Sequence, residues 1–159
     1  MELVTGRLSL DEFEAEVTAI ADFLVAVGVP AVLVTFGAGC DYDQIDPLEP
    51  VLVAPALLAS FVDEQDERGA YRLAASDLFL KADSGGLAFL LCEEADIHCY
   101  ADDPASVADI RERWATLYPD AHEADRESRS WRSLRGGPWR PFVGASEPAE
   151  PGAAPDTAR

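Results

Sequence analysis

The sequence predicts an α+β fold, with an antiparallel-dominated sheet of about four or five strands and three helices in the order αβα-βββ-α. Two observations support this prediction. The chain has 159 residues and is 48% hydrophobic, which is enough for one domain with its own core. Helical apolar periods also flank a series of short apolar runs between positions 71 and 100, and these runs are separated by turn signals.

The first helix is predicted from a capping motif at its start and from a stripe of apolar residues at helical spacing. Ser9 and Glu12 form a capping box, so a helix begins there, and Gly28 is placed to end it. Apolar residues then recur at helical spacing and predict a buried face: Phe13, Val17, Ile20, Leu24 and Val27. Acidic residues that fall off this stripe predict a solvated face: Glu12, Glu14, Glu16 and Asp22.

A buried strand and a second helix follow. Residues 31–36 are apolar and β-branched without polar alternation, which predicts a strand covered on both faces. Residues 37–50 are interrupted by glycine and proline and read as a loop. Pro55 opens a helix whose apolar side carries Leu57, Leu58, Phe61 and Val62, and which stops at Gly69.

Strands dominate the next thirty residues, and a last helix closes the domain. Alternation predicts extended chain over 71–75 and 77–81, a turn at 83–86, a central strand at 87–92 and a shorter strand at 96–100. Asp103 and Pro104 begin the final helix. Its predicted buried stripe is Val107, Ile110, Trp114 and Leu117, and it ends at Tyr118-Pro119.

The charge is strongly acidic and unevenly distributed. The formal net charge is −18, and the first 124 residues carry twenty-five acidic side chains against six basic ones. Such a surface repels nucleic acid and anionic membrane and attracts basic proteins. We therefore take three acidic groups as candidate partner-binding residues: Asp41, Asp43, Asp46 and Glu49 in the loop, Asp63, Glu64, Asp66 and Glu67 at the end of the second helix, and Glu93 and Glu94.

The C-terminal part predicts a separate organisation. We expect residues 1–119 to form the acidic domain, 120–143 a basic strap packed on it, and 144–159 a disordered tail. The strap holds five arginines together with Trp131, Trp139 and Phe142. Aromatic and arginine residues interleaved in this way also suit a free arm that binds nucleic acid. We favour docking, because the acidic body opposes nucleic-acid affinity.

The cysteines indicate a reduced protein without a disulfide framework. Cys40, Cys92 and Cys99 are an odd number and contain no close pair of the kind that strong zinc signatures use. In an extended strand, His98 and Cys99 point to opposite faces of the sheet. We therefore favour core cysteines over a metal site, while the convergence of Cys40, Cys92, His98 and Cys99 stays open.

Two enzyme-like arrangements are weaker alternatives. Cys92 and His98 could face each other across a hairpin, with Glu94 or Asp96 as orienting group, as in a cysteine hydrolase. A carboxylate beside a cysteine raises the pKa of the thiol, which opposes that role. The acidic loop departs from the EF-hand calcium pattern, and Gly37-Ala38-Gly39 lacks the third glycine or lysine of a phosphate-binding loop.

Together these features predict a small acidic intracellular protein that binds a basic protein, for instance an inhibitor or immunity-type antidote that blocks a basic enzyme or toxin. We expect no enzymatic activity, no cofactor, no membrane association and a cytoplasmic location, and we leave the oligomeric state open. The alternatives are a regulatory module for a small ligand bound between sheet and helices and, ranked lower, a Cys/His metal-dependent or cysteine hydrolase.

Overall fold

One mixed sheet organises the chain in the computed structural model, which describes residues 1–36, 50–69, 71–124 and 140–141. The strand order is β7-β1-β6-β5-β4-β2-β3-β8. The strands are β1 (Glu2–Val4), β2 (Val32–Phe36), β3 (Val51–Val53), β4 (Leu78–Ala82), β5 (Leu87–Leu91), β6 (Ile97–Ala101), β7 (His122–Glu123) and β8 (Arg140–Pro141). The first seven pair antiparallel, and β8 adds in parallel to β3.

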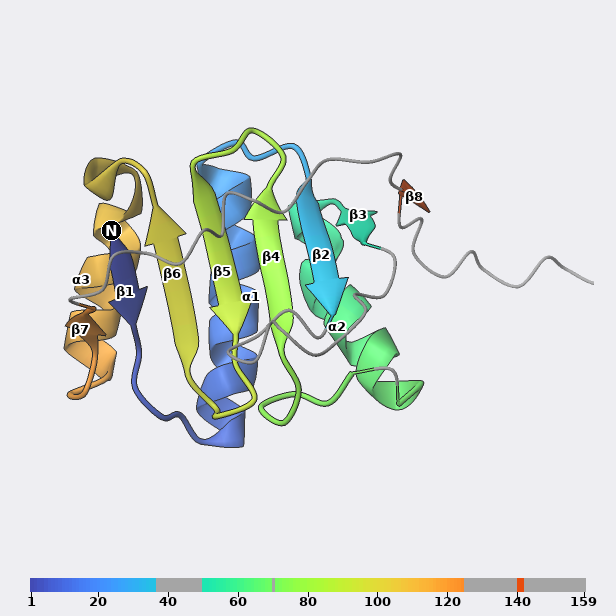
Figure 1. The fold of residues 1–159 in the computed structure, drawn as a ribbon, viewed down its shortest axis with the longest axis horizontal. Helices are drawn as coiled ribbons and strands as arrows, with labels where there is room; N and C mark the ends of the chain where they lie inside the picture. Colours follow the sequence, from blue (N-terminus) through green and yellow to red (C-terminus); the bar gives the residue numbers. More distant parts are fainter. Residues whose placement is uncertain (37–49, 70, 125–139, 142–159) are drawn as a thin grey trace, which may run out of the picture.

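Three α-helices lie on one face of this sheet, as Figure 1 shows. They are α1 (Leu10–Ala26), α2 (Leu58–Glu67) and α3 (Ala108–Leu117), and a short 3₁₀ turn precedes each of α2 and α3, at Pro55–Leu57 and Pro104–Val107. The predicted α+β class, the three helices and the antiparallel sheet are therefore confirmed. No helix among the described residues is long and apolar enough to cross a bilayer.

The helix boundaries follow from the predicted caps. The Ser9 hydroxyl accepts a hydrogen bond from the Glu12 backbone N–H, and the Glu12 carboxylate accepts one from the Ser9 N–H at 2.8 Å. Asp103 Oδ1 accepts a hydrogen bond from the Ala105 N–H at 2.9 Å and opens the segment that leads into α3. Gly28 has a φ of 74° just beyond α1, a left-handed conformation that glycine adopts without strain.

The predicted strand count was too low, and one predicted strand is absent. The sheet gains β1, β3, β7 and β8, which are only two or three residues long and carry no detectable period of their own. Residues 71–72 have no regular structure and 73–75 form a turn instead of extended chain, and Ala74 has a φ of 55°, which lies outside the β region. The predicted element order αβα-βββ-α did not include β1. In the sheet, β1 lies between β6 and β7, which come much later in the chain.

The main core lies between the sheet and the helices. Phe13, Ile20 and Leu24 of α1 are almost completely buried there, beside Leu78, Leu80 and Phe89 of the central strands. Three helical positions differ from the predicted stripes. Val27 and Leu117 are about half exposed, since each lies at a helix end beyond the sheet, whereas Glu16 is completely buried.

Glu16 is buried because three side chains satisfy its carboxylate. Trp114 Nε1 donates to Oε2 at 2.9 Å, Tyr118 Oη donates to Oε1 at 2.7 Å, and Arg113 Nε donates to Oε1 at 2.9 Å. A buried carboxylate is stable only when its lone pairs are hydrogen-bonded and its charge is paired. The prediction that Glu16 faces solvent was therefore wrong, and this residue joins α1 to α3.

The second face of the sheet is also largely buried, although the three helices lie on the other side. The strand register places Phe79, Leu90 and His98 in one row across β4, β5 and β6, and Ala88 and Tyr100 in the next. Phe79, Ala88, Leu90 and Cys92 form a small apolar cluster against which Tyr100 packs. This face carries the cluster of reactive side chains described below.

The predicted strap and tail lie mostly outside the described residues, which include only residues 120–124 and 140–141 of that region. The proposed division into residues 1–119, 120–143 and 144–159 therefore stays a prediction. The described part adds β7 to the sheet just beyond the predicted domain boundary, since Leu3 pairs with Glu123 and Val4 with His122.

Candidate functional site around Cys92, Asp96 and His98

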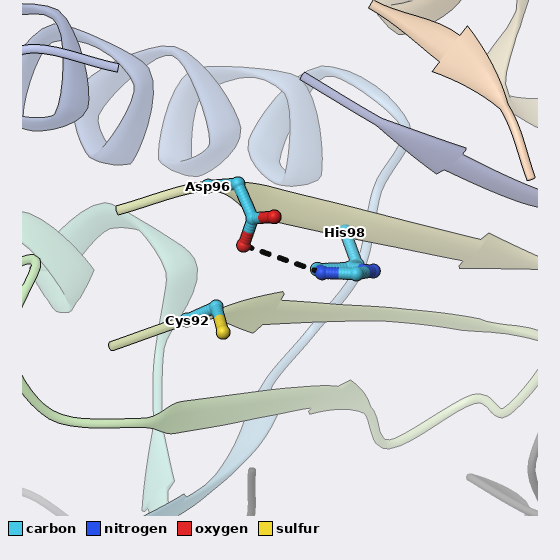
Figure 2. Close-up of side chains that lie close together, drawn as sticks. All are labelled: Cys92, Asp96 and His98. Carbon is cyan, nitrogen blue, oxygen red and sulfur yellow. Dashed lines mark ion pairs between the residues drawn. The ribbon is translucent and has the colours of Figure 1, made fainter. Parts of the chain in front are cut away.

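A tight turn between β5 and β6 brings a thiol, a carboxylate and an imidazole together. The Cys92 N–H donates to the Asp96 carbonyl at 2.9 Å, and the Ala95 N–H donates to the Cys92 carbonyl at 3.0 Å. Ala95 has a φ of 64°, and this left-handed residue turns the chain back at that point. Figure 2 shows the three side chains of Cys92, Asp96 and His98 converging, and one candidate ligand atom from each lies within 4.8 Å of the other two.

His98 lies between two carboxylates. Its Nδ1 is 2.8 Å from Glu2 Oε1 on β1, and its Nε2 is 3.3 Å from Asp96 Oδ1. Only about a sixth of the His98 side chain is exposed. Burial by itself lowers the pKa of His98, but the interactions with Asp96 and Glu2 outweigh it and raise the pKa to about 9.

Asp96 is held as a carboxylate by the same neighbours. Burial raises its pKa, but the contacts with His98 and with the Cys92 thiol have the larger combined effect and lower it. Asp96 Oδ1 is shielded from solvent and accepts no well-aligned hydrogen bond from the described residues; its contact with His98 is an ion pair at 3.3 Å. This oxygen therefore faces the imidazole and still has capacity to accept a hydrogen bond.

The other cysteines do not join the cluster within the described part of the chain. Cys99 points to the helix side of the sheet and His98 to the opposite side, as the alternation along a strand predicts. Burial raises the pKa of the Cys99 thiol to about 12, so it behaves as a core residue. Cys40 lies outside the described residues.

The sequence interpretation found part of this cluster. Cys92 and His98 were weighed both as metal ligands together with the other cysteines and as a cysteine hydrolase pair, and Asp96 was considered only as an orienting group. Glu2 was missed, because a three-residue strand at the start of the chain has no pattern that predicts its pairing with β6. The register Glu2 with Tyr100 and Val4 with His98 supplies that contact.

Two of the three predicted acidic groups gather at one end of the sheet. Figure 1 shows the end of α2, the turn between β5 and β6 and the start of α1 all at the end where β4 begins. The Leu8 N–H donates to the Ala95 carbonyl at 2.7 Å, which fixes the start of α1 beside that turn. We call this surface the acidic end; its acidic members are Asp11, Glu12, Asp63, Glu64, Asp66, Glu67, Glu93 and Glu94.

The acidic end contains arginines as well. Arg7 and Arg72 flank α1 and α2 in sequence, and Arg68 forms an ion pair with Glu64 one helical turn earlier. The acids outnumber these three arginines, and most of their side chains are exposed. The third predicted group, Asp41, Asp43, Asp46 and Glu49, lies outside the described residues, although β2 ends at Phe36 on this same end.

A hollow lies at another place, where β1, α3 and β7 meet. It has a volume of about 150 Å³ and is lined by Leu3, Val4, Arg111, Trp114, Ala115, Ala121, His122 and Glu123. Pockets for small organic ligands usually measure roughly 300–1,000 Å³. This hollow is too small to support the small-ligand alternative by itself.

Comparisons with known proteins give no family for this chain. No protein-family model matches it, and neither a curated protein nor a solved structure matches it.

Proposed function

We propose that this protein binds a basic protein through the acidic end and acts as an inhibitor or immunity-type antidote. The observation that carries the proposal is that three separate segments rich in acidic residues, the start of α1, the end of α2 and the β5–β6 turn, lie at one end of the sheet (Figure 1). The sequence places these groups more than eighty residues apart, from Asp11 to Glu94.

The local structure favours the interpretation that these acids form an interaction surface over the interpretation that they are only the solvated end of a helix. Asp63, Asp66 and Glu67 at the C-terminal end of α2 oppose the helix dipole, which costs some tenths of a kcal/mol each. Glu93 and Glu94 are exposed in a turn whose backbone is fixed by the Glu93 N–H, which donates to Asp77 Oδ1 at 2.8 Å. A fixed turn presents both carboxylates at low entropic cost on binding.

Electrostatics explains how such a surface would act. Opposite net charges raise association rates by roughly 10- to 1,000-fold, and an acidic face can occupy a cleft that is built for phosphate groups. Because these charges are exposed, salt screens them over about 8 Å at 0.15 M. Binding is therefore expected to weaken as salt is added.

The experiment is charge reversal with a matched control. In the test variant, Asp63, Glu64, Asp66 and Glu67 are changed to lysine. In the control, four exposed acids away from the acidic end are changed to lysine instead: Asp22, Asp83, Asp109 and Glu112. Both variants change the net charge equally, so a difference between them reports the position of the charge.

We expect wild type and control to capture the same basic protein from native lysate, and the test variant to associate with the purified partner at least about 10-fold more slowly. Association is measured by surface plasmon resonance at two salt concentrations, after circular dichroism has shown that both variants fold. Equal association rates for the two variants would exclude the α2 cluster as the binding surface.

A further inference from the structure

We propose that Cys92, Asp96 and His98 form a binding site for a divalent transition metal of the zinc type. This proposal is independent of the protein-binding function, because the three residues lie on the second face of the sheet and not among the exposed acids. A thiol, an imidazole and a carboxylate are the three ligand types that zinc uses in proteins.

The spacing of the ligand atoms fits a tetrahedral ion. Bonds of about 2.0–2.1 Å from zinc to nitrogen and oxygen place those two atoms about 3.3 Å apart in a tetrahedron. The distance between Asp96 Oδ1 and His98 Nε2 is 3.3 Å. The longer zinc–sulfur bond of about 2.3 Å requires about 3.6 Å from sulfur to each of them, and Cys92 Sγ lies within 4.8 Å of one imidazole nitrogen of His98 and one carboxylate oxygen of Asp96. Any remaining gap is therefore at most about 1.2 Å.

A carboxylate on the far side of the imidazole supports the same assignment. Glu2 Oε1 lies 2.8 Å from His98 Nδ1. If that nitrogen donates its proton to Glu2, the lone pair of Nε2 points toward Cys92 and Asp96. Metal-binding histidines almost always make such a contact with their other ring nitrogen, since it fixes the tautomer and the ring orientation. Glu2 is thus a positioning residue.

The site is rigid yet reachable. The two backbone hydrogen bonds of the Cys92–Asp96 turn hold the first two ligands side by side. Cys92 is fully buried, whereas 16% of the His98 side chain and 19% of the Asp96 side chain are exposed. Three protein ligands are the number found in zinc sites that keep a fourth position for water or another ligand. Within the described part of the chain, the site therefore offers three ligands and leaves the fourth position open.

Charge is conserved when the ion enters. A divalent ion that binds the Cys92 thiolate and neutral His98 displaces the thiol proton and the Nε2 proton of the imidazolium, so two positive charges replace two protons. Glu2 and Asp96 remain ionised throughout. The partly buried site therefore accepts the ion without a change in its net charge, which avoids a new desolvation cost.

Cobalt(II) is the probe that tests this site, because its bond to a thiolate absorbs in the near ultraviolet. The full chain, reduced and freed of metal by a chelator, is titrated with Co²⁺. We expect one ion per chain, a thiolate-to-cobalt charge-transfer band, visible bands of four-coordinate intensity and displacement by Zn²⁺. Absence of the charge-transfer band in the wild type would overturn the proposal.

Variants identify the ligands. Cys92→Ser is expected to abolish the charge-transfer band, and Cys99→Ser, the matched control on the opposite face, is expected to keep it. Asp96→Asn should weaken Co²⁺ binding more than about 100-fold, and Glu2→Gln about 10- to 100-fold with the band retained. Asp96→Asn preserves side-chain volume and decides the question if Cys92→Ser does not fold. A band that persists in Cys92→Ser, or an Asp96→Asn affinity equal to wild type, refutes the assignment.

Discussion

Glu16 is the residue on which the contact between α1 and α3 depends most. It is completely buried and accepts hydrogen bonds from Arg113, Trp114 and Tyr118. Burial of Tyr118 and its bond to Glu16 raise the pKa of the phenol, so Tyr118 stays a neutral donor. Glu16→Ala leaves the Trp114 and Tyr118 donors without their acceptor, whereas the half-exposed Arg113 can turn to water.

We predict that Glu16→Ala lowers the free energy of unfolding by roughly 3 kcal/mol, measured by urea denaturation. Glu14→Ala is the matched control, since Glu14 is an exposed glutamate on the same helix and should change stability by about 0.5 kcal/mol or less. Similar losses in the two variants would mean that the buried hydrogen bonds contribute nothing net.

The misassignment of Glu16 has a simple cause. The residue lies three positions after Phe13 and four before Ile20, so helical geometry puts it on the buried stripe. The charge of a glutamate alone suggested that the Glu16 side chain faces solvent. The donors that make burial possible are about a hundred residues away in the chain, and no local pattern reveals them.

At the scale of elements, we expect the contacts of His98 on β6 with Asp96 and with Glu2 of β1 to make the stability of the fold depend on pH. The pKa of His98 is raised from 6.5 to about 9 in the folded protein. A raised pKa stabilises the folded state fully below the unfolded value, and that stabilisation is lost as the pH rises through about 9. The loss amounts to roughly 3 kcal/mol at most.

The comparison with His98→Gln isolates this effect, because other groups also titrate in the same range. In protein kept in a chelator, the wild type should exceed the variant in unfolding free energy near pH 6, and the difference should shrink as the pH approaches 10. Urea unfolding at a series of pH values measures this. A difference that stays constant or grows with pH would contradict the assignment of the charged imidazole.

The elements that could be predicted are those with local signals. The capping box of Ser9 and Glu12, the Asp103 cap and the apolar strands β2, β4 and β5 follow from residues that are neighbours in sequence. The strands β1, β3 and β7 have two or three residues, which is too short for a period, and they exist because longer strands pair with them. The alternation of Tyr71, Leu73 and Ala75 imitated a strand.

The candidate metal site was partly predictable for the same reason. Cys92 and His98 belong to the two sides of a hairpin that the sequence indicated, but His98 lies opposite Leu90 in the register and Asp96 is the residue opposite Cys92. The convergence of Asp96 depends on the turn at Ala95, and Glu2 comes from the opposite end of the chain. The acidic residues of α2 and of the β5–β6 turn were identified individually. Their meeting at one end depends on the topology of the whole sheet.

At the scale of the whole molecule, the chain leaves the sheet at one edge and returns at the other. β7 ends at Glu123 and β8 begins at Arg140, at opposite ends of the strand order. Eight strands spaced about 4.8 Å apart span roughly 34 Å, and seventeen residue steps of about 3.3 Å reach roughly 56 Å. The connection is thus long enough to cross the sheet, and the helices already occupy one face.

We therefore predict that a chain cut after Asp125 melts about 5–10 °C lower than the full chain, which corresponds to roughly 2–3 kcal/mol, and binds a hydrophobic dye. If the strap docks on the apolar second face around Phe79 and Leu90, the cut exposes that face to solvent. A chain cut after Gly144 is the control and should melt like the full chain. Equal melting temperatures for the two truncations would support a free arm instead of a docked strap.

The position of β1 between β6 and β7 also sets the order in which the chain can fold. Leu3 pairs with Cys99 and with Glu123, so β1 can pair only with strands that lie about a hundred residues later in the chain. During synthesis, the N-terminal end leaves the ribosome long before they exist. Proteins dominated by pairings of large sequence separation fold in milliseconds to seconds rather than microseconds. We therefore expect the polar contact of Glu2 with His98 to form late, after the hairpin of β4 and β5 has assembled from local sequence.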